Sequence, residues 1–168
     1  MNIGIKKLQK LKMLYKNYTH QFWMQQAIDL TKTVKGEIPI AALIVKDNKL
    51  ISKAVNKTET LLDATAHAEI NAIREASLVL SNWRLNGCVL YTTLEPCAMC
   101  MGAILNSRIS KLVFSAYDIN LGACGSALNL ANELNKNEQI EIIGGVLELK
   151  SSELLKNFFA SKRSFIKI

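Results

Sequence analysis

The sequence predicts an α/β fold, a three-layer α/β/α sandwich with a central mixed five-stranded sheet. Three observations lead to this prediction. A helical pattern precedes two short apolar runs joined by a turn, and helical and apolar segments alternate after them. A hairpin followed by such an alternation gives both antiparallel and parallel strand pairs, covered on both faces. The 168 residues contain no repeat or linker, so one core is expected.

The first 18 residues differ from the rest of the chain. They carry five lysines within the first 16 residues, with apolar side chains near helical spacing. This pattern fits an amphipathic helix, and it fits equally a solvated extension or an upstream start with Met13 as a second candidate. We predict a basic extension over 1–18 and a single domain over 19–168.

The first elements of the domain are a helix over 20–35, followed by Gly36, and strands over 40–45 and 50–55. Asp47 and Asn48 lie between the two strands and favour a hairpin turn. The remaining elements alternate in type. Helices are expected over 67–80, 96–106, 128–135 and from 151 onward, and strands over 88–92, 111–115 and 140–143.

Amino-acid composition alone gives only weak evidence about the binding partner. The formal net charge of +7 suits a polyanion, but 17 of the 21 basic residues are lysine. A lysine-rich profile can come from nucleotide composition alone, so charge by itself is weak support for nucleic-acid binding. No apolar run approaches the ~18 residues that cross a bilayer, and the N-terminus lacks the apolar region of a secretory signal. We expect a cytoplasmic location.

Two motifs carry the chemistry: His67-Ala68-Glu69 and Pro96-Cys97-Ala98-Met99-Cys100. One imidazole and two thiolates fill three positions of a tetrahedral zinc and leave the fourth to water. An open position beside a free carboxylate is typical of hydrolytic zinc sites, whereas a structural zinc is fully capped by protein. Each motif is expected to open a helix, with Pro96 as the first helical residue of the second, where the positive helix end favours thiolates.

Each motif alone has an ordinary explanation. A lone His-x-Glu is more often a chance pair than a site, and Cys-x-x-Cys occurs in structural zinc knuckles and redox pairs. A structural zinc needs a fourth protein ligand, and the other histidine, His20, precedes the core fold. A redox pair gives no account of the histidine and the carboxylate. Cys88 and Cys124 are expected to be reduced, inert thiols, and a thiolate–zinc site favours a reducing compartment.

A family resemblance covers nearly the whole chain apart from the extension. It rests on four segments: Thr65-Ala66-His67-Ala68-Glu69-Ile70, Leu90-Tyr91-Thr92-Thr93-Leu94-Glu95-Pro96-Cys97, Asp118-x-x-x-Gly122-Ala123-x-Gly125-Ser126 and Asn157-Phe158-Phe159. These segments resemble the bacterial tRNA-specific adenosine deaminases of the cytidine/deoxycytidylate deaminase superfamily. The resemblance implies a cytidine deaminase-like fold, a tRNA anticodon stem-loop as substrate and conversion of its wobble adenosine to inosine. It also implies one Zn²⁺ per subunit and a homodimer.

By this resemblance, zinc is held by His67, Cys97 and Cys100, with water as the fourth ligand. Glu69 then moves protons between that water, the purine ring and the departing ammonia. Further matches to substrate-contacting positions are Asn56, Asp118, Phe158, Phe159 and Arg163.

The substrate-contacting matches differ in their roles. Asn56 matches a base-contacting asparagine, and Asp118 matches a loop aspartate that faces the RNA backbone or ribose. Phe158, Phe159 and Arg163 match an RNA-facing tail, where aromatic rings beside cations suit stacked bases and phosphates. Ordinary alternatives are a turn asparagine, a loop cap and a core helix. We expect only one of the two phenylalanines to contact RNA.

Departures from the family pattern leave the chemistry intact but affect the RNA contacts. Ile40-Ala41 stands where the family often has Val-Gly, Ser115 where it has glycine and Asn120 where it has lysine. The main alternative is a deaminase of a free nucleobase or nucleoside, such as guanine or cytosine, which would share every zinc residue. A non-catalytic, zinc-stabilised RNA-binding subunit is a second alternative, and retention of Glu69 argues against it.

Overall fold

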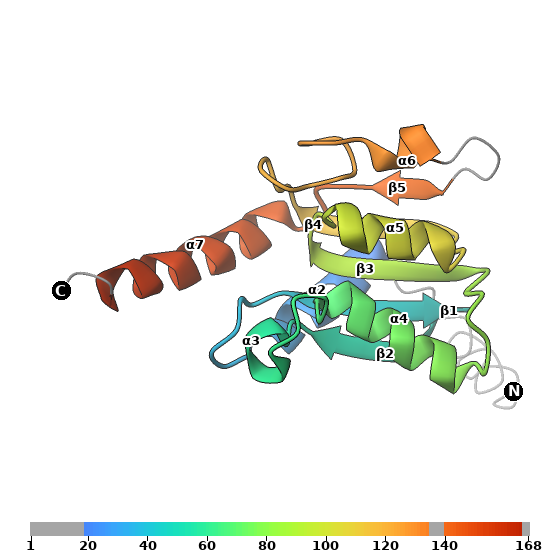
Figure 1. The fold of residues 1–168 in the computed structure, drawn as a ribbon, viewed down its shortest axis with the longest axis horizontal. Coiled ribbons are helices and arrows are strands. Elements are labelled where there is room, and N and C mark those ends of the chain that lie inside the picture. Colours follow the sequence, from blue (N-terminus) through green and yellow to red (C-terminus); the bar gives the residue numbers. More distant parts are fainter. Residues whose placement is uncertain (1–18, 135–139, 166–168) are drawn as a thin grey trace, which may run out of the picture.

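The computed structural model describes residues 19–134 and 140–165, so the predicted extension over 1–18 lies outside the described residues (Figure 1). Its sheet has five strands in the order β2-β1-β3-β4-β5. β1 (Ala41–Lys46) pairs antiparallel with β2 (Lys49–Val55) and with β3 (Cys88–Leu94). β4 (Lys111–Ala116) and β5 (Glu141–Ile143) continue the sheet in parallel with β3. The predicted mixed five-stranded sheet is confirmed.

One face of the sheet packs against α4 (Ala68–Val79) and α5 (Ala98–Asn106), which lie side by side in Figure 1. Strand side chains alternate between the two faces, so Leu90 points to this side. It joins a cluster in which Met101 and Ile104 of α5 are fully buried. This packing fixes the beginnings of α4 and α5 beside the ends of the strands.

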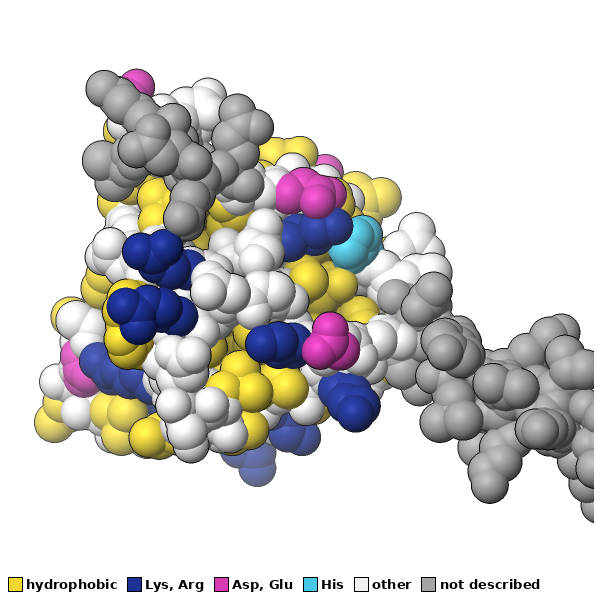
Figure 2. Space-filling model, turned by 90° about the vertical axis from the view of Figure 1, so that its right-hand side faces the viewer, with side chains coloured by type: hydrophobic (Ala, Val, Ile, Leu, Met, Phe, Trp, Pro, Cys, Tyr) yellow, Lys and Arg dark blue, Asp and Glu magenta, His cyan; other side chains and the backbone are white. Residues whose placement is uncertain are grey.

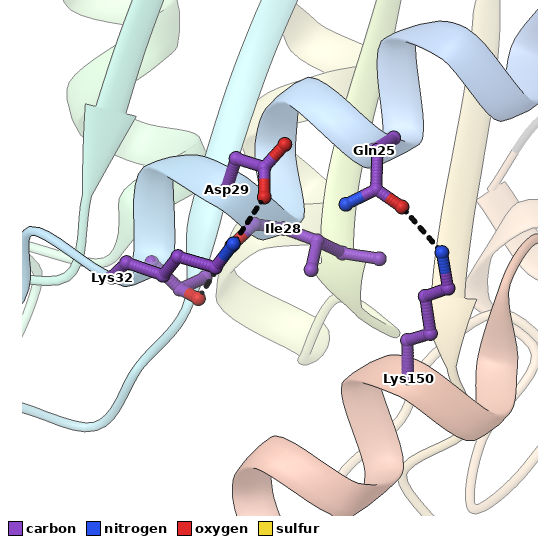
Figure 3. Close-up of polar contacts among 6 residues, drawn as sticks. Gln25, Ile28, Asp29, Lys32 and Lys150 are labelled. Carbon is purple, nitrogen blue, oxygen red and sulfur yellow. Dashed lines mark hydrogen bonds and ion pairs between the residues drawn. The ribbon is translucent and has the colours of Figure 1, made fainter.

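The other face packs against α2 (His20–Thr31) and the first part of α7 (Glu148–Phe165). Tyr91 points to this side and is buried with residues of α2. The two helices are also joined directly, because Lys150 Nζ donates to Gln25 Oε1 at 2.6 Å (Figure 3). Beyond this contact α7 leaves the body of the molecule (Figure 1). With helices on both faces, the predicted three-layer sandwich is confirmed.

Several predicted boundaries shift for local reasons. The hairpin turn is as predicted, with Asp47 and Asn48 at positive φ of 48° and 59°. The helix predicted over 20–35 ends at Thr31, whose hydroxyl donates to the Ile28 carbonyl at 2.7 Å. Near that end Lys32 pairs with Asp29 at 2.6 Å (Figure 3).

Other helices also differ from the sequence prediction. The helix predicted from Pro96 begins at Ala98, with Cys97 at its N-cap. The last helix begins at Glu148, before the predicted residue 151. A short helix, α3 (Thr58–Leu61), was not predicted, and α6 (Leu130–Leu134) falls within the predicted segment 128–135.

Figure 2 shows the end of the molecule that faces away from α7. Lysine and arginine side chains are spread over this end, with apolar side chains between them and few acidic ones. The β1–β2 turn and the beginnings of the parallel strands lie here. Among the described residues, no helix combines the length and the hydrophobicity needed to span a membrane.

Candidate active site and zinc centre

A pocket of about 540 Å³ opens at the carboxyl ends of β3 and β4. This is the edge of an open α/β sheet where ligand sites usually form. The pocket is lined by side chains from six separate stretches of the chain. Those relevant to the chemistry are Glu37, Asn56, His67, Glu69, Cys97, Asp118 and Phe159. The pocket therefore exists only in the completed fold.

His67 and Glu69 enter the pocket from the beginning of α4. His67 occupies the N-cap with extended backbone angles, and Glu69 lies in the first helical turn. The turn before them is held against β2, because Asn71 Nδ2 donates to the carbonyls of Val55 and Ala66 at 3.2 and 3.0 Å. Two residues so close in sequence reach one pocket because the helix begins between them, as the sequence predicted.

The three predicted zinc ligands lie together. His67 Nδ1 is 3.7 Å from Cys97 Sγ and 3.5 Å from Cys100 Sγ. Zinc binds nitrogen at ~2.0 Å and sulfur at ~2.3 Å, so tetrahedral geometry separates such ligand atoms by about 3.6 Å. Within the described part of the chain, this is the one group of three His, Cys, Asp or Glu side chains arranged to hold a metal. Its donor types and spacing fit zinc.

The charges at this cluster suit a cation. A hydrogen bond from Cys100 lowers the pKa of Cys97 to about 5, and the same contact, with burial, raises the pKa of Cys100. This shift favours the thiolate form of Cys97, the form that binds metal. Glu69 is 4% exposed, and burial raises the pKa of its carboxyl group. It lies outside the three-residue cluster and lines the same pocket.

Asn56 lies just after β2 and is buried in the pocket wall. Its Nδ2 donates to Glu37 Oε2 at 3.0 Å, and its Oδ1 accepts from Thr58 Oγ1 at 3.1 Å. Glu37 Oε1 accepts from the backbone N–H of Thr60 at 2.7 Å, which attaches α3 to the segment before β1. The amide of Asn56 is thus held by hydrogen bonds at both ends.

Asp118 lies in the loop that follows β4. Its Oδ1 accepts from the backbone N–H groups of Asn120 and Leu121 at 3.0 and 3.1 Å. The carboxylate therefore organises its own loop, the ordinary role that the sequence left open, and it also lines the pocket. Both oxygens of Glu95 serve the same loop. They accept hydrogen bonds from Asp118 N at 3.1 Å, from Cys124 N at 2.9 Å and from the backbone and hydroxyl of Ser126.

The two phenylalanines of α7 have different positions. Phe159 is 45% exposed and lines the pocket, whereas Phe158 is half-buried. Their rings contact each other edge to face, with centroids 5.4 Å apart, and Lys162 Nζ lies 5.7 Å from the centre of the Phe158 ring. The side chain of Arg163 lies outside the described residues.

The pocket wall is acidic. Five carboxylates line it, and none of the described lining residues is lysine or arginine. They are Glu37, Glu59, Glu69, Glu95 and Asp118. The pocket therefore suits a cation and a neutral base better than a phosphate.

Sequence reasoning missed three of these carboxylates as site residues, namely Glu37, Glu59 and Glu95. Glu95 had a usable signal, since it stands two residues before Cys97 in a quoted motif. Glu37 had no such sequence signal, because its partner Asn56 is 19 residues away and only the fold brings the two residues together.

Comparison with known proteins agrees with this geometry. The model of the cytidine and deoxycytidylate deaminase zinc-binding region matches residues 17–116. A tRNA-specific adenosine deaminase of Bacillus subtilis is 43% identical over 145 residues, which cover 85% of this chain and 90% of that protein. The zinc-binding region and the His/Cys/Cys cluster together make zinc the cofactor of this protein.

Solved structures give the same result. One from a study of A-to-I editing by tRNA:A34 deaminases has a TM-score of 0.75 and 37% identity, covering 79% of this chain and 97% of that one. A guanine deaminase from Nitrosomonas europaea has a TM-score of 0.71 at 25% identity, covering 83% of this chain and 84% of that one. The chain is an enzyme that belongs to the tRNA-specific adenosine deaminase family, within the cytidine and deoxycytidylate deaminase superfamily.

Proposed function

We propose that this protein hydrolyses adenosine to inosine at the wobble position of a tRNA anticodon stem-loop. The observation that carries the chemistry is the buried carboxylate of Glu69, which lines one pocket with the zinc ligands His67 and Cys97 without joining the metal cluster. The substrate follows from the relatives, which are named tRNA-specific adenosine deaminases at much higher identity than the guanine deaminase.

His67, Cys97 and Cys100 would hold the metal. When bound, zinc acts as a Lewis acid that lowers the pKa of a water molecule to about 7. Glu69 accepts a proton from the attacking water and delivers it to the purine ring nitrogen beside the reacting carbon. A C–O bond forms, the C–N bond to the amine breaks, and Glu69 passes the second proton to the leaving group. One water is consumed and one ammonia is released.

The remaining pocket residues would bind the substrate. Asn56 presents an amide that can donate to and accept from a purine edge. Asp118 can accept a hydrogen bond from a ribose hydroxyl. Phe159 is exposed at the pocket and can stack on a base, whereas Phe158 supports the Phe159 ring by an edge-to-face contact. Arg163 is proposed from the resemblance alone.

We also propose a homodimer in the cytoplasm. Exposed apolar side chains beside α3 and α4 support self-association, since Leu62 is 91% and Leu78 80% exposed. Leu61 and Leu78 line a second cavity of about 420 Å³. Thiolate zinc ligands favour a reducing compartment. Light scattering at several protein concentrations tests the dimer, and a monomer at all of them would contradict it.

The function is tested by inosine formation on an anticodon stem-loop with adenosine at the wobble position. Free adenine, adenosine, guanine and cytosine are assayed beside it, with Glu69→Ala as the inactive control. We expect inosine in the stem-loop only. Ammonia release from a free base, with the stem-loop unchanged, would retain the zinc chemistry and refute the tRNA substrate.

A further inference from the structure

Glu37 is a buried carboxylate of the pocket wall that takes no part in the proton transfers above. It is 5% exposed, and both of its oxygens are used. Oε2 accepts from Asn56 Nδ2 at 3.0 Å, and Oε1 accepts from the backbone N–H of Thr60 at 2.7 Å. No lysine or arginine lines the pocket among the described residues, and a buried charge without a cationic partner is costly, so these hydrogen bonds must compensate for the desolvation of Glu37.

The ionised state of Glu37 determines which end of the Asn56 amide faces it. Burial opposes the charge, but hydrogen bonds from Thr60, from the backbone of Glu59 and from Asn56 outweigh burial and hold the pKa of Glu37 below its ordinary value. An ionised carboxylate only accepts hydrogen bonds, so the NH₂ group of the amide must face it. Thr58 Oγ1 donates to the oxygen at the other end of the amide.

An asparagine side chain has nearly the same shape after a half-turn, and only its hydrogen-bond partners fix its orientation. Here the partners leave one N–H and one oxygen lone pair of Asn56 for a bound base, in a fixed order. A purine ring nitrogen can accept from that N–H. If the amide were turned over, the carbonyl oxygen would meet the nitrogen lone pair and repel it.

We propose that Glu37 is a positioning residue that fixes the orientation of the Asn56 amide and so makes Asn56 a donor to a ring nitrogen of the bound base. This inference rests on the proposed function, because it assigns part of the base specificity of the same pocket.

The decisive variant is Glu37→Gln. Thr60 N–H still needs an acceptor, so the carbonyl of the new side chain takes that place and its NH₂ group faces Asn56. Two NH₂ groups cannot hydrogen-bond to each other, so the amide of Asn56 turns over. We expect the KM for the stem-loop to rise roughly tenfold, the loss of one hydrogen bond, with a smaller change in kcat and unchanged zinc content.

A double-mutant cycle with Asn56→Ala separates positioning from a general structural role. If Glu37 acts through Asn56, adding Glu37→Gln to Asn56→Ala raises KM no further. Stem-loops with 7-deazaadenosine or 3-deazaadenosine at the target position supply a second readout. The wild-type enzyme should act less efficiently on the analogue that lacks the ring nitrogen to which Asn56 donates. The Glu37→Gln variant should lose this difference between the analogues. Additive effects in the cycle, or unchanged discrimination, would overturn the proposal.

A spectroscopic readout keeps the inference separate from the proposed function. The side-chain amide protons of Asn56 in the free protein should exchange slowly and shift when Glu37 is replaced by Gln. Glu59→Gln is the matched control, since it removes a carboxylate from the same pocket, keeps the backbone hydrogen bond of Glu59 to Glu37 and should leave these resonances unchanged. If Glu37→Gln does not fold, Glu37→Asp is used in its place. The aspartate side chain is shorter, so its carboxylate lies farther from Asn56, and the amide resonances of Asn56 are measured in the same way. Unshifted amide protons refute the positioning role, whereas failure to form inosine refutes only the function.

Discussion

The backbone of Gly122 lies directly against the buried carboxylate of Glu95. A β-carbon at position 122 would overlap the Glu95 carboxyl group and the Asp118 carbonyl oxygen. The loop that follows β4 therefore closes around Glu95, two residues before a zinc ligand. The backbone of Ala123 also donates to the carbonyl of Pro96 at 2.8 Å, so the loop and the metal-binding segment hold each other in place.

Replacing Gly122 by alanine should therefore displace the loop that carries Asp118. We expect kcat/KM on the stem-loop to fall on the order of 100-fold, as for a misplacement of about 1 Å, with zinc retained. Gly102→Ala is the matched control. Apart from its chain neighbours and the backbone of its own helix, no atom of the described residues lies within 4 Å of its added carbon, and alanine favours the helix in which it lies. Equal activity of the two variants would show that the loop tolerates displacement.

Metal content should separate the roles of Cys97 and Glu69. Cys97→Ala removes one of three protein ligands, so we expect loss of zinc and of activity, with a lower unfolding temperature. Glu69→Ala should retain zinc and lose turnover. Elemental analysis of purified proteins measures this, with Cys124→Ala as a variant that removes a thiol outside the cluster. Zinc bound at wild-type level in Cys97→Ala would refute its assignment as a ligand.

The two phenylalanines of α7 should respond differently to alanine substitution. Phe159→Ala removes an exposed ring from the pocket and should weaken stem-loop binding roughly tenfold, with little change in stability. Phe158→Ala removes a half-buried ring and should lower the unfolding temperature more and the affinity less. Titration of each variant with labelled stem-loop decides this, and a larger affinity loss for Phe158→Ala would reverse the assignment.

Ser115 carries a buried hydroxyl that costs stability. Its Oγ makes no hydrogen bond within the described structure, and the residue is fully buried in β4. Ser115→Ala should raise the free energy of unfolding by about 1 kcal/mol. Ser107→Ala is the contrasting variant, since that buried hydroxyl donates to the Ile104 carbonyl at 3.0 Å. Ser107→Ala should lower the free energy of unfolding by a similar amount, and denaturant titrations of both variants measure this quantity. Destabilisation by both changes would mean that Ser115 has a partner.

Tyr91 should ionise at a higher pH than an ordinary tyrosine. Burial raises the pKa of its phenol to about 12. The folded pKa lies above the unfolded value of about 10, so this group stabilises the fold below pH 10 and loses that contribution as the pH rises through 12. When tyrosinate formation in the folded protein is followed by ultraviolet absorbance, one tyrosine should ionise near pH 12, and this transition should be absent in Tyr91→Phe. A wild-type curve without it would contradict the prediction.

His20 and Tyr91 also illustrate what the sequence could not reveal. Strand and helix patterns predicted the sheet and the layers, because alternation and helical spacing are local properties. The zinc cluster was predictable because Cys97 and Cys100 share one helix beginning and His67 begins another. The hydrogen bond of 2.9 Å between His20 and Tyr91 joins residues 71 apart and follows only from packing.

The same distinction applies within the pocket. The role of Glu37 depends on contacts across 19 and 23 residues of sequence, which no spacing rule records. The different positions of Phe158 and Phe159 depend on the direction in which α7 leaves the sheet. The helix end at Thr31 depends on a side-chain hydrogen bond that competes with continuation of the helix.

The acidic wall of the pocket has a consequence for the small molecules of the cell. Free adenine nucleotides such as AMP and ATP present the same base as RNA, but each also carries a charged phosphate group on the same ribose. Such a molecule entering this pocket would bring its phosphates close to the carboxylates of Glu37, Glu59 and Asp118, with no lining lysine or arginine among the described residues to offset the repulsion. If the base of an RNA loop turns into this pocket, its flanking phosphates can remain outside the acidic wall. The acidic wall is therefore expected to disfavour free adenine nucleotides as substrates relative to a base presented by RNA.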